Sequence, residues 1–415
     1  MVFNSKMNSS LTERTVYMDI LTAKKEVIQA GKKLVETGLI ARTWGNVSCR
    51  VDDHNFVITP SGKPYDSLTP DDIVEVSITD LNWTGDVKPS SEKGIHAEVY
   101  KAHPEAGFVI HTHQKFASII SATSHGIPAL TQAGQKIIGD KVLLASYGLP
   151  GTGKLKNGVA QALEKDKNTK AVIMAHHGAV VFGADSEEAF NVAKQLERES
   201  VLYVLNEFAK LGDKVEDLTE MCKAWARMRG SNANANYEDC FNNSYRINDD
   251  EVVFYPAGDK SKKIVLDLKT GKYTGEGCSP LAEVHKAVYK ARKDINVILY
   301  SDKPEVNAVA RTGKKLKPQL DDCAQIIGRS IKCAVNEPKK VVKALKGRHG
   351  VLLREGGALC CGSNEGNAQA VEMIMEKSCL TKIGSSLFGK TKPINPIECL
   401  LMRVIYLKKY SKQAE

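Results

Sequence analysis

The chain contains an internal repeat, and this repeat constrains its fold more than any other feature of the sequence. The stretch HAEVYKAHPEAGFVIHTH, which begins at His96, resembles HKAVYKARKDINVILYSD, which begins at His285. Two further matches flank this one in the same order: GNVSCRVDD at Gly45 with FNNSYRINDD at Phe241, and VIMAHHGAVVFG at Val172 with LLREGGALCCG at Leu352. Three matches in one order and at similar separations predict two related domains.

The predicted boundary between these domains lies in a charged stretch between the repeats. The full length of 415 residues is long for a single domain. Residues 210–217 are rich in charge and separate the last match of the first copy from the first match of the second. We therefore predict one domain at 1–213 and a second at 214–415.

Both copies mix short strands with amphipathic helices. The segments 56–60, 107–113 and 171–182 are short, apolar and rich in β-branched residues, which predicts strands. Residues 21–37 and 186–211 carry apolar side chains at helical spacing, so we expect two helices that each bury one face. The sequence therefore predicts α/β domains, although these patterns alone do not fix the strand order.

Three histidines and one carboxylate of the first copy form a candidate metal site. His111 and His113 end an apolar run, and residues i and i+2 of an extended strand project from the same face. His177 follows a later apolar strand, and Glu92 precedes an expected helix. Such ligands leave an open position on zinc for a substrate oxygen. Taken alone, an HxH pattern is a weak signal, and a carboxylate at a helix start also complements the helix dipole.

The second copy provides an internal control for the metal interpretation. Its aligned positions hold Leu281, Tyr300, Asp302 and Gly356 in place of Glu92, His111, His113 and His177. Residues that served the fold should persist in both copies, so this joint replacement favours a metal site in the first copy and a second copy without ligands. His96, by contrast, persists as His285, which indicates a role in packing.

Three turns near the candidate ligands suit a phosphate group. They are TWGNVS at 43–48, TPSG at 59–62 and PSS at 89–91. Hydroxyls and unhindered backbone N–H groups in such turns can cradle an anion. The last turn directly precedes Glu92, and this position favours phosphate binding over an ordinary turn.

The motifs GNVS, TPSG, KPSSE, HTH and HHG, in this order, resemble those of the class II aldolase/adducin family, and most of all the L-fuculose-phosphate aldolases. The resemblance is strong over 19–211 and extends to the second half as a degenerate copy. It implies three-layer α/β/α domains around a largely antiparallel sheet, commonly assembled as a tetramer with sites between neighbours. The chain is thus expected to be a tandem of an active domain and a pseudo-domain. Two chains would form a dimer of tandems that mimics the tetramer, or four would form a tetramer.

The resemblance also implies a role for each matching residue. By this resemblance, His111, His113 and His177 hold zinc, and Mn²⁺ or Co²⁺ is also compatible with such ligands. Glu92 matches the carboxylate that ligates the ion at rest and then acts as the catalytic acid and base. The phosphate-binding positions of the family match Thr43, Asn46, Ser61, Gly62, Ser90 and Ser91.

The implied reaction is the reversible cleavage of a (deoxy)ketose 1-phosphate, such as L-fuculose 1-phosphate, to dihydroxyacetone phosphate and an aldehyde such as lactaldehyde. The metal would polarise the substrate carbonyl and stabilise the enediolate that cleavage leaves. On the same site, 4-epimerisation of a pentulose 5-phosphate, dehydration of a methylthioribulose phosphate or decarboxylation of a related acid are alternatives. A non-catalytic adducin-like scaffold is a further alternative, which the complete ligand set of the first copy argues against.

One position departs from the family pattern and concerns the proton donor. The family aldolase has a tyrosine just after the segment that resembles IPAL, and this residue protonates the aldehyde oxygen across a subunit interface. Here Gln132 occupies that position. Tyr147 or a residue of the second copy is the candidate to replace it, and a different reaction is the alternative.

Charge, hydropathy and cysteine usage argue against other classes of protein. The net charge is +9 without a long basic run, so we do not expect nucleic-acid binding. No segment approaches the roughly 18 apolar residues of a membrane helix, and the N-terminus lacks the apolar core of a secretory signal. The ten cysteines include no CxxC pair, which is typical of a reduced, cytoplasmic protein. The expected partners are therefore a small-molecule sugar phosphate and further copies of the chain.

Overall fold

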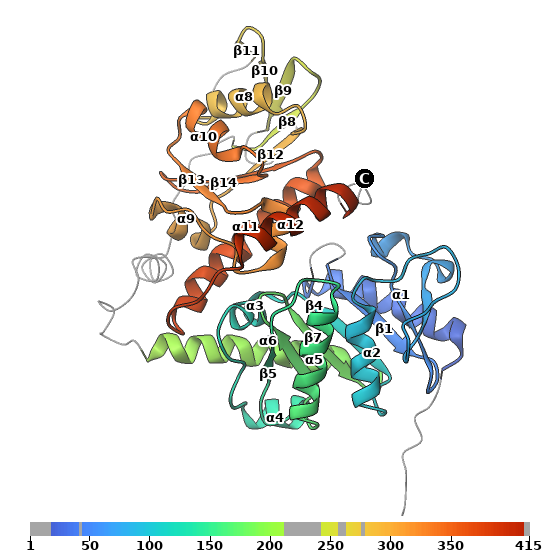
Figure 1. The fold of residues 1–415 in the computed structure, drawn as a ribbon. Helices are drawn as coiled ribbons and strands as arrows, with labels where there is room; N and C mark the ends of the chain where they lie inside the picture. The colour runs from blue at the N-terminus through green and yellow to red at the C-terminus, as the bar shows by residue number, and fades with distance from the viewer. Residues whose placement is uncertain (1–17, 41–43, 211–241, 256–262, 275–278, 411–415) are drawn as a thin grey trace, which may run out of the picture.

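The computed structural model describes residues 18–40, 44–210, 242–255, 263–274 and 279–410 (Figure 1). The predicted domain boundary at 213 and the candidate residue Thr43 lie outside these ranges. Within them, no helix combines the length and the apolar character that a membrane span requires. The described cysteines are free thiols.

A sheet of seven strands forms the middle layer of the first domain (Figure 1). Its order is β3-β2-β1-β4-β7-β6-β5, and the described strands all pair antiparallel except β5 with β6. The strands are β1 (Asn46–Arg50), β2 (Asn55–Ile58), β3 (Val74–Ser77), β4 (Phe108–Thr112), β5 (Leu143–Ala145), β6 (Ala171–Met174) and β7 (Ala179–Gly183). Because β1 and β7 both flank β4, the middle of the sheet brings three distant parts of the chain together.

Helices cover both faces of this sheet. They are α1 (Ile20–Glu36), α2 (Lys93–Ala102), α3 (Lys115–Ser121), α4 (Gln132–Ile138), α5 (Gly153–Lys165) and α6 (Ser186–Ala209), with short 3-10 turns at Tyr65–Ser67 and Pro70–Asp72. Apolar side chains of α1, α3 and α6 pack on one face of the sheet, and those of α2 and α5 pack on the other. Burial of these apolar faces holds the three layers together.

The second domain repeats this architecture and adds one edge strand. Its order β11-β10-β9-β8-β12-β15-β14-β13 follows the first sheet strand for strand, and among the described strands only β13 and β14 pair in parallel. Its strands are β8 (Ser244–Arg246), β9 (Glu251–Phe254), β10 (Ile264–Asp267), β11 (Tyr273–Thr274), β12 (Val297–Ser301), β13 (Lys332–Ala334), β14 (Gly350–Leu353) and β15 (Ala358–Gly362). Its helices are α8 (Ala282–Ala291), α9 (Pro304–Arg311), α10 (Pro338–Leu345), α11 (Glu365–Ser386) and α12 (Pro396–Ile405), with π-helical turns at Cys323–Ile327 and Tyr406–Tyr410.

Two three-layer α/β/α domains with largely antiparallel sheets are therefore present, as the sequence predicts. The helices expected at 21–37 and 186–211 correspond to α1 and α6. The apolar segment 171–182 forms two strands, β6 and β7, joined by a tight turn in which His176 takes a left-handed backbone with φ of 61°. Since β7 pairs with β4, this turn carries His177 to the end of β4.

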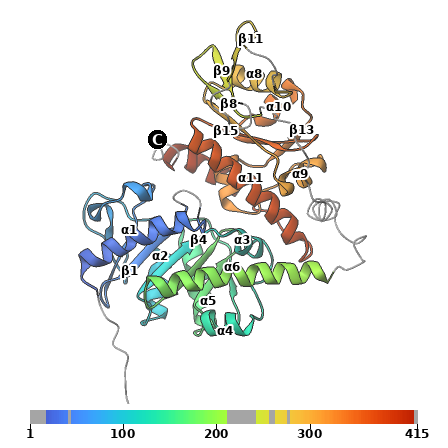
Figure 2. The ribbon, with the colours of Figure 1, turned by 180° about the vertical axis from the view of Figure 1, so that it is seen from behind.

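Close helix packing joins the two domains (Figure 2). Helix α11 of the second domain lies against α3 of the first. A side-chain carbon added at Gly384 of α11 would lie 2.8 Å from the side chain of Ile119, so this glycine permits the close approach. Leu380 of α11 is buried in the hydrophobic core of the first domain. The second domain therefore contributes to the core of the first.

Candidate metal centre

Three histidines of the first domain meet at the end of β4. His111 lies in β4, His113 follows its last residue, and His177 lies in the turn between β6 and β7. One ring nitrogen from each lies within 4.8 Å of those of the other two. His111 and His177 are buried, whereas His113 is partly accessible at the edge of a pocket. The structure thus brings together the three histidines that the sequence singles out.

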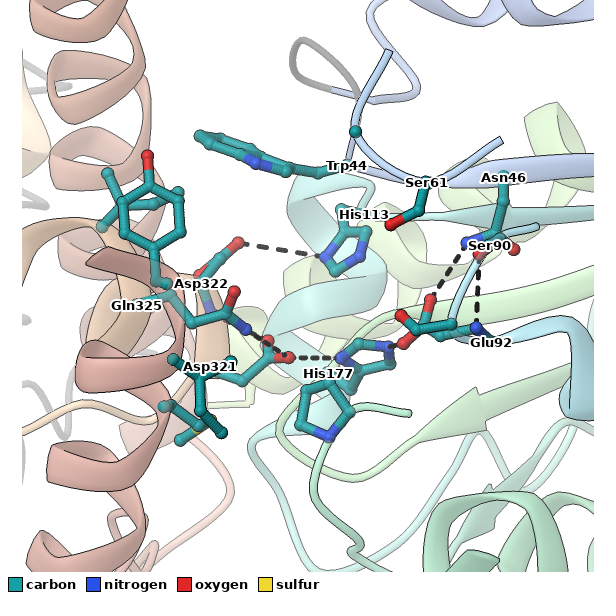
Figure 3. A pocket seen from close by; sticks show the side chains of 18 of the residues that line it. Trp44, Asn46, Ser61, Ser90, Glu92, His113, His177, Asp321, Asp322 and Gln325 are labelled. Atoms are coloured by element: carbon teal, nitrogen blue, oxygen red, sulfur yellow. Dashed lines mark hydrogen bonds and ion pairs between the residues drawn. The ribbon is translucent and has the colours of Figure 1, made fainter. Parts of the chain in front are cut away.

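Glu92 faces the same point from the start of α2 (Figure 3). Its carboxylate oxygens lie 2.9 Å from Nε2 of His177 and 3.3 Å from Nε2 of His111. Asn46 donates a hydrogen bond of 3.0 Å from Nδ2 to the same carboxylate. Burial disfavours the charged form, but the rings of His177 and His111 outweigh it and hold the pKa of Glu92 below its usual value. Glu92 is therefore an anion at neutral pH.

The hydrogen bonds of the rings leave the appropriate atoms available to a cation. Nδ1 of His111 donates to the carbonyl oxygen of Ala179 at 2.9 Å, so its lone pair is on Nε2. Nδ1 of His177 lies 2.5 Å from a carboxylate oxygen of Asp321, which fixes the same tautomer. In the described part of the chain, both Nε2 atoms are buried without a well-aligned hydrogen bond. Three imidazoles and one carboxylate therefore fit a divalent cation such as Zn²⁺, Mn²⁺ or Co²⁺.

Sequence reasoning missed two acidic residues of the second domain that lie beside these histidines. Asp321 is 1% exposed and contacts His177, and Oδ2 of Asp322 lies 3.9 Å from Nδ1 of His113. Burial lowers the pKa of His177, but the carboxylates of Asp321 and Glu92 outweigh it and raise that pKa well above its usual value. The two domains thus meet at the candidate metal centre.

No pattern in the sequence alone singles out Asp321, but the structure relates it to a residue of the first domain. An isolated β-bridge at Ile127 in the first domain recurs at Leu316 in the second. Asp321 follows Leu316 by the same number of residues as Gln132 follows Ile127. Asp321 therefore occupies, in the second domain, the position of Gln132 in the first.

A pocket of about 500 Å³ opens in front of the centre, and both domains line it (Figure 3). The candidate phosphate-binding residues Asn46, Ser61, Gly62, Ser90 and Ser91 all lie in its first-domain wall. The second domain contributes Asp321, Asp322, Gln325, Ile326, Leu401, Met402, Ile405 and Tyr406. The pocket thus joins polar turns of the first domain to an apolar wall formed mainly by α12.

The candidate phosphate-binding side chains differ in what they already contact. Ser90 accepts a hydrogen bond of 3.2 Å from the backbone N–H of Glu92, and the amide of Asn46 donates to the Glu92 carboxylate. These two residues therefore hold Glu92 in place. Ser61 and Ser91 are accessible at the pocket, where their hydroxyls can meet a ligand.

Neither Gln132 nor Tyr147 is among the described residues that line the pocket. Gln132 is exposed at the start of α4, and Tyr147 packs its ring beside His176, with centroids 5.4 Å apart. Tyr65 and Tyr406 are the tyrosines of the described pocket wall. The hydroxyl of Tyr65 donates to a backbone carbonyl oxygen at 2.9 Å, whereas Tyr406 comes from the second domain.

The second domain holds different side chains at the place equivalent to the metal centre. The pairing of β12 with β15 positions Tyr300 as the pairing of β4 with β7 positions His111. A carbon added at Gly357 would lie 2.5 Å from the Tyr300 ring, so this glycine makes room for the ring. Leu281 is buried at the position of Glu92. An aromatic ring and an aliphatic side chain thus occupy this part of the second domain.

His96 belongs to a buried network that both domains keep. In the first domain, Oγ of Ser48 lies 2.6 Å from Nδ1 of His96 and 2.7 Å from the hydroxyl of Tyr100. In the second, Ser244 makes the same contacts with His285 and Tyr289, at 2.7 and 2.9 Å. Burial lowers the pKa of both histidines to about 3, so they are neutral. This network supports the packing role predicted for His96.

Comparison with known sequences identifies the family. The family described as Class II Aldolase and Adducin N-terminal domain matches residues 25–204 and 242–383, one region in each domain. The fold and this double match define the class of protein: the chain belongs to the class II aldolase and adducin family.

Relatives at about one-third identity are aldolases. The 5-methylthioribulose-1-phosphate/5-deoxyribulose-1-phosphate aldolase of Rhodospirillum rubrum is 32% identical over 41% of this chain and 75% of its own length. The L-fuculose phosphate aldolase of Escherichia coli K12 is 33% identical over 43% of this chain and 81% of its own length. Among solved structures, an L-fuculose 1-phosphate aldolase shares 31% identity over 45% of this chain and 86% of its own, with a TM-score of 0.42. The two sequence matches each cover less than half of this chain, in agreement with the two regions that the family matches.

Proposed function

We propose that this protein is a metal-dependent aldolase that reversibly cleaves a deoxyketose 1-phosphate, such as L-fuculose 1-phosphate, to dihydroxyacetone phosphate and an aldehyde. The observation that carries the proposal is the position of three histidines and Glu92 at a pocket lined by hydroxyl-bearing turns. The first domain would be catalytic. The second, with Leu281, Tyr300, Asp302 and Gly356 at the equivalent positions, would be a pseudo-domain without ligands, and the division would lie near 213.

The residues proposed to hold the cation are Glu92, His111, His113 and His177. When bound, a divalent cation such as Zn²⁺ polarises a carbonyl group and stabilises negative charge on its oxygen. Ser61 and Ser91, with the backbone at Gly62, would bind the phosphate, because hydroxyls and free N–H groups in turns favour anions. Gly62 lines the pocket with φ of 79°, a conformation that favours glycine and lets a ligand approach the backbone closely.

Cleavage requires two proton transfers that residues of this chain are placed to serve. The hydroxyl on C4 loses its proton, the C3–C4 bond breaks, and the electron pair remains on C3 until C3 gains a proton. Glu92, fixed by Asn46 and Ser90, would exchange the proton at C3. Tyr406 would exchange the proton on the C4 oxygen, which becomes the aldehyde oxygen. It would replace the family tyrosine, whose position Gln132 occupies here, because it reaches the pocket from the second domain.

The apolar wall of the pocket supports a substrate whose far end carries no hydroxyl. Leu401, Met402 and Ile405 of α12 line the pocket from the second domain, whereas the polar turns line it from the first. A terminal methyl or methylthio group would lose contact with water on binding there, which favours association by about 25 cal/mol per Å² of apolar surface. The names of the relatives, which act on L-fuculose, 5-deoxyribulose or methylthioribulose phosphates, describe substrates of this kind.

We expect the zinc-loaded protein to cleave L-fuculose 1-phosphate about 10- to 100-fold more efficiently than L-tagatose 1-phosphate, which differs only by a hydroxyl on C6. A hydroxyl buried without a partner costs about 1–3 kcal/mol, and about 1.4 kcal/mol corresponds to a factor of ten. A coupled assay of dihydroxyacetone phosphate release gives kcat/KM for both sugars. Leu401→Asn should narrow the preference, whereas Leu400→Asn, exposed on the same helix outside the pocket lining, should not.

The same assay separates the competing reactions. Equal efficiency toward the two sugars would contradict the proposed substrate class. An epimer or a dehydrated product without dihydroxyacetone phosphate would identify a different reaction on the same centre. Inertness toward all these sugars, together with no bound metal, would favour a non-catalytic scaffold.

We further propose that two chains associate as a dimer of tandems. Segment 316–328 of the second domain reaches the first-domain centre, whereas helix α4, which belongs to the equivalent segment of the first domain, lies at the end of that domain away from the second (Figure 1). Such a head-to-tail contact closes into a ring when its rotation allows, and a second chain would complete a ring of four domains. A native mass of about two chains is expected. A stable and fully active monomer would count decisively against this assembly.

A further inference from the structure

The turn that carries His177 is tied to a short segment of the second domain, residues 319–322 (Figure 3). The backbone N–H of Asp321 donates to the carbonyl oxygen of His176 at 3.0 Å, and Nδ1 of His176 donates to the carbonyl oxygen of Gln319 at 2.8 Å. The carboxylate of Asp321 accepts from Nδ1 of His177 at 2.5 Å. Three hydrogen bonds therefore connect this turn to the other domain.

Asp321 is itself held in one orientation. Its Oδ1 accepts from the backbone N–H of Asp322 at 2.8 Å, and Nε2 of Gln325 lies 3.5 Å from its Oδ2. Because a carboxylate accepts and does not donate, Nδ1 of His177 carries a proton toward Asp321, and Nε2 is the ring nitrogen that faces Glu92. Rotation of the ring would break this bond between two side chains that are only 3% and 1% exposed, so the contact with Asp321 fixes the orientation of the ring.

The second domain also holds His113. Lys377 of α11 donates from Nζ to the carbonyl oxygen of His113 at 3.2 Å and to the carboxylate of Asp322 at 2.7 Å. That carboxylate lies 3.9 Å from Nδ1 of His113. By contrast, His111 is held within its own domain, by the carbonyl oxygen of Ala179. Two of the three histidines thus depend on the second domain for their surroundings.

This contact belongs to the second copy alone within the described chain. The first-domain residue equivalent to Asp321 is Gln132, which is exposed on α4 at the far end of its domain (Figure 1). The repeated fold therefore places the same segment in two environments, and only the second-copy segment lies against a histidine cluster. The second copy thus contributes to the centre of the first, although its own equivalent positions hold no histidine.

We propose that the second domain is the positioning half of the first domain's metal centre, and that Asp321 is the positioning residue that orients the ring of His177 toward the cation. This inference rests on the proposed metal-dependent function. A carboxylate on the second nitrogen of a metal-binding imidazole fixes both its tautomer and its orientation, and loss of such a partner typically weakens metal binding 10- to 100-fold. The centre is thus assembled from two domains of one chain.

Zinc affinity measured by competition with a chromophoric chelator tests this role on the full chain. Asp321→Ala should bind Zn²⁺ about 10- to 100-fold more weakly than wild type. The visible spectrum of its Co²⁺ form should also change, because that spectrum follows the coordination geometry. Asp321→Asn keeps the volume and an accepting oxygen but loses the charge, so its affinity should fall less, by about 3- to 10-fold. Asp302→Asn, which removes an exposed carboxylate of the same domain, should leave both readouts unchanged.

The outcomes separate this role from the proposed function. Wild-type zinc affinity and Co²⁺ spectrum in both Asp321 variants would overturn the positioning role and leave a metal-dependent aldolase intact. A lower melting temperature with unchanged affinity would show that Asp321 serves only the domain interface, and would also overturn it. If the wild-type protein itself binds no Zn²⁺, the proposed metal-dependent function is contradicted, and the positioning role that rests on it is contradicted as well.

Discussion

Replacing His113 by alanine is expected to release the bound cation and to lower cleavage of a ketose 1-phosphate by at least about 1,000-fold, without unfolding the protein. The magnitude follows because a bound cation supplies several kcal/mol of charge stabilisation in the transition state, and each 1.36 kcal/mol is a factor of ten. His113 suits this test because its ring lies at the pocket and is not part of the apolar core clusters of the described first domain, so alanine removes a ligand without opening either core.

Activity, metal content and far-ultraviolet circular dichroism should be measured on one preparation of His113→Ala. His54→Ala, which removes an exposed imidazole of the same domain, is the matched control and should keep full activity. Removal of the bound cation from the wild-type protein with a chelator should reproduce the loss of cleavage activity, and added Zn²⁺ should restore the activity. Global unfolding of His113→Ala would make this histidine a core residue and contradict the metal interpretation.

The four candidate ligands could be predicted from the sequence because the repeat separates two kinds of residue. Side chains that serve the fold persist in both copies, as His96 and His285 do within the same buried network. The strand order could not be predicted in the same way, because periodicity reports which face of a segment is buried and not which strand lies beside it. The sheet order instead depends on pairings between distant segments, such as β1 with β4.

Asp321 illustrates why the second-domain residues of the centre could not be predicted from the sequence. Its contact with His177 joins positions 144 residues apart and depends on how two folded domains dock. Spacing and composition describe each domain separately, so they give no information on that docking. Even the alignment of Asp321 with Gln132 becomes meaningful only once the second domain is known to face the first-domain centre.

Comparison of the two copies shows where their buried networks diverge. In the first domain, Nε2 of His96 lies 2.5 Å from Oδ1 of Asn46, whose amide in turn donates to Glu92. In the second, Asn242 accepts from a serine hydroxyl at 2.8 Å instead, and Nε2 of His285 has no partner within the described residues. Both domains therefore keep the contacts among serine, histidine and tyrosine. In the described part of the second domain, the hydrogen bonds that connect this histidine through an asparagine to the candidate metal centre are absent. This pattern fits the proposed pseudo-domain, which keeps the fold but holds none of the four candidate ligands at the equivalent positions.

The largest loss of stability is expected from Lys377→Met. Nζ of Lys377 lies 2.7 Å from the carboxylate of Asp322, and both side chains are only 5% exposed. Methionine is similar in length but uncharged, so it would leave the Asp322 carboxylate buried beside His113 without its cation. Removing one partner of a buried ion pair costs about 3–5 kcal/mol. Urea unfolding followed by circular dichroism should show this as a lower free energy of unfolding.

A second lysine at the same domain interface provides the control. Lys115 lies 2.7 Å from Glu376 of α11, but its side chain is 48% exposed, so Lys115→Met should cost less than about 1 kcal/mol. The loss in Lys377→Met should also shrink as the pH falls. Burial already raises the pKa of Asp322, loss of the lysine would raise it further, and the protonated carboxyl buries no charge. An equal free energy of unfolding for Lys377→Met and Lys115→Met at neutral pH would contradict this prediction. It would show that the Asp322 carboxylate is stabilised by another group, and that the contacts of the second domain with His113 do not depend on the Lys377–Asp322 ion pair.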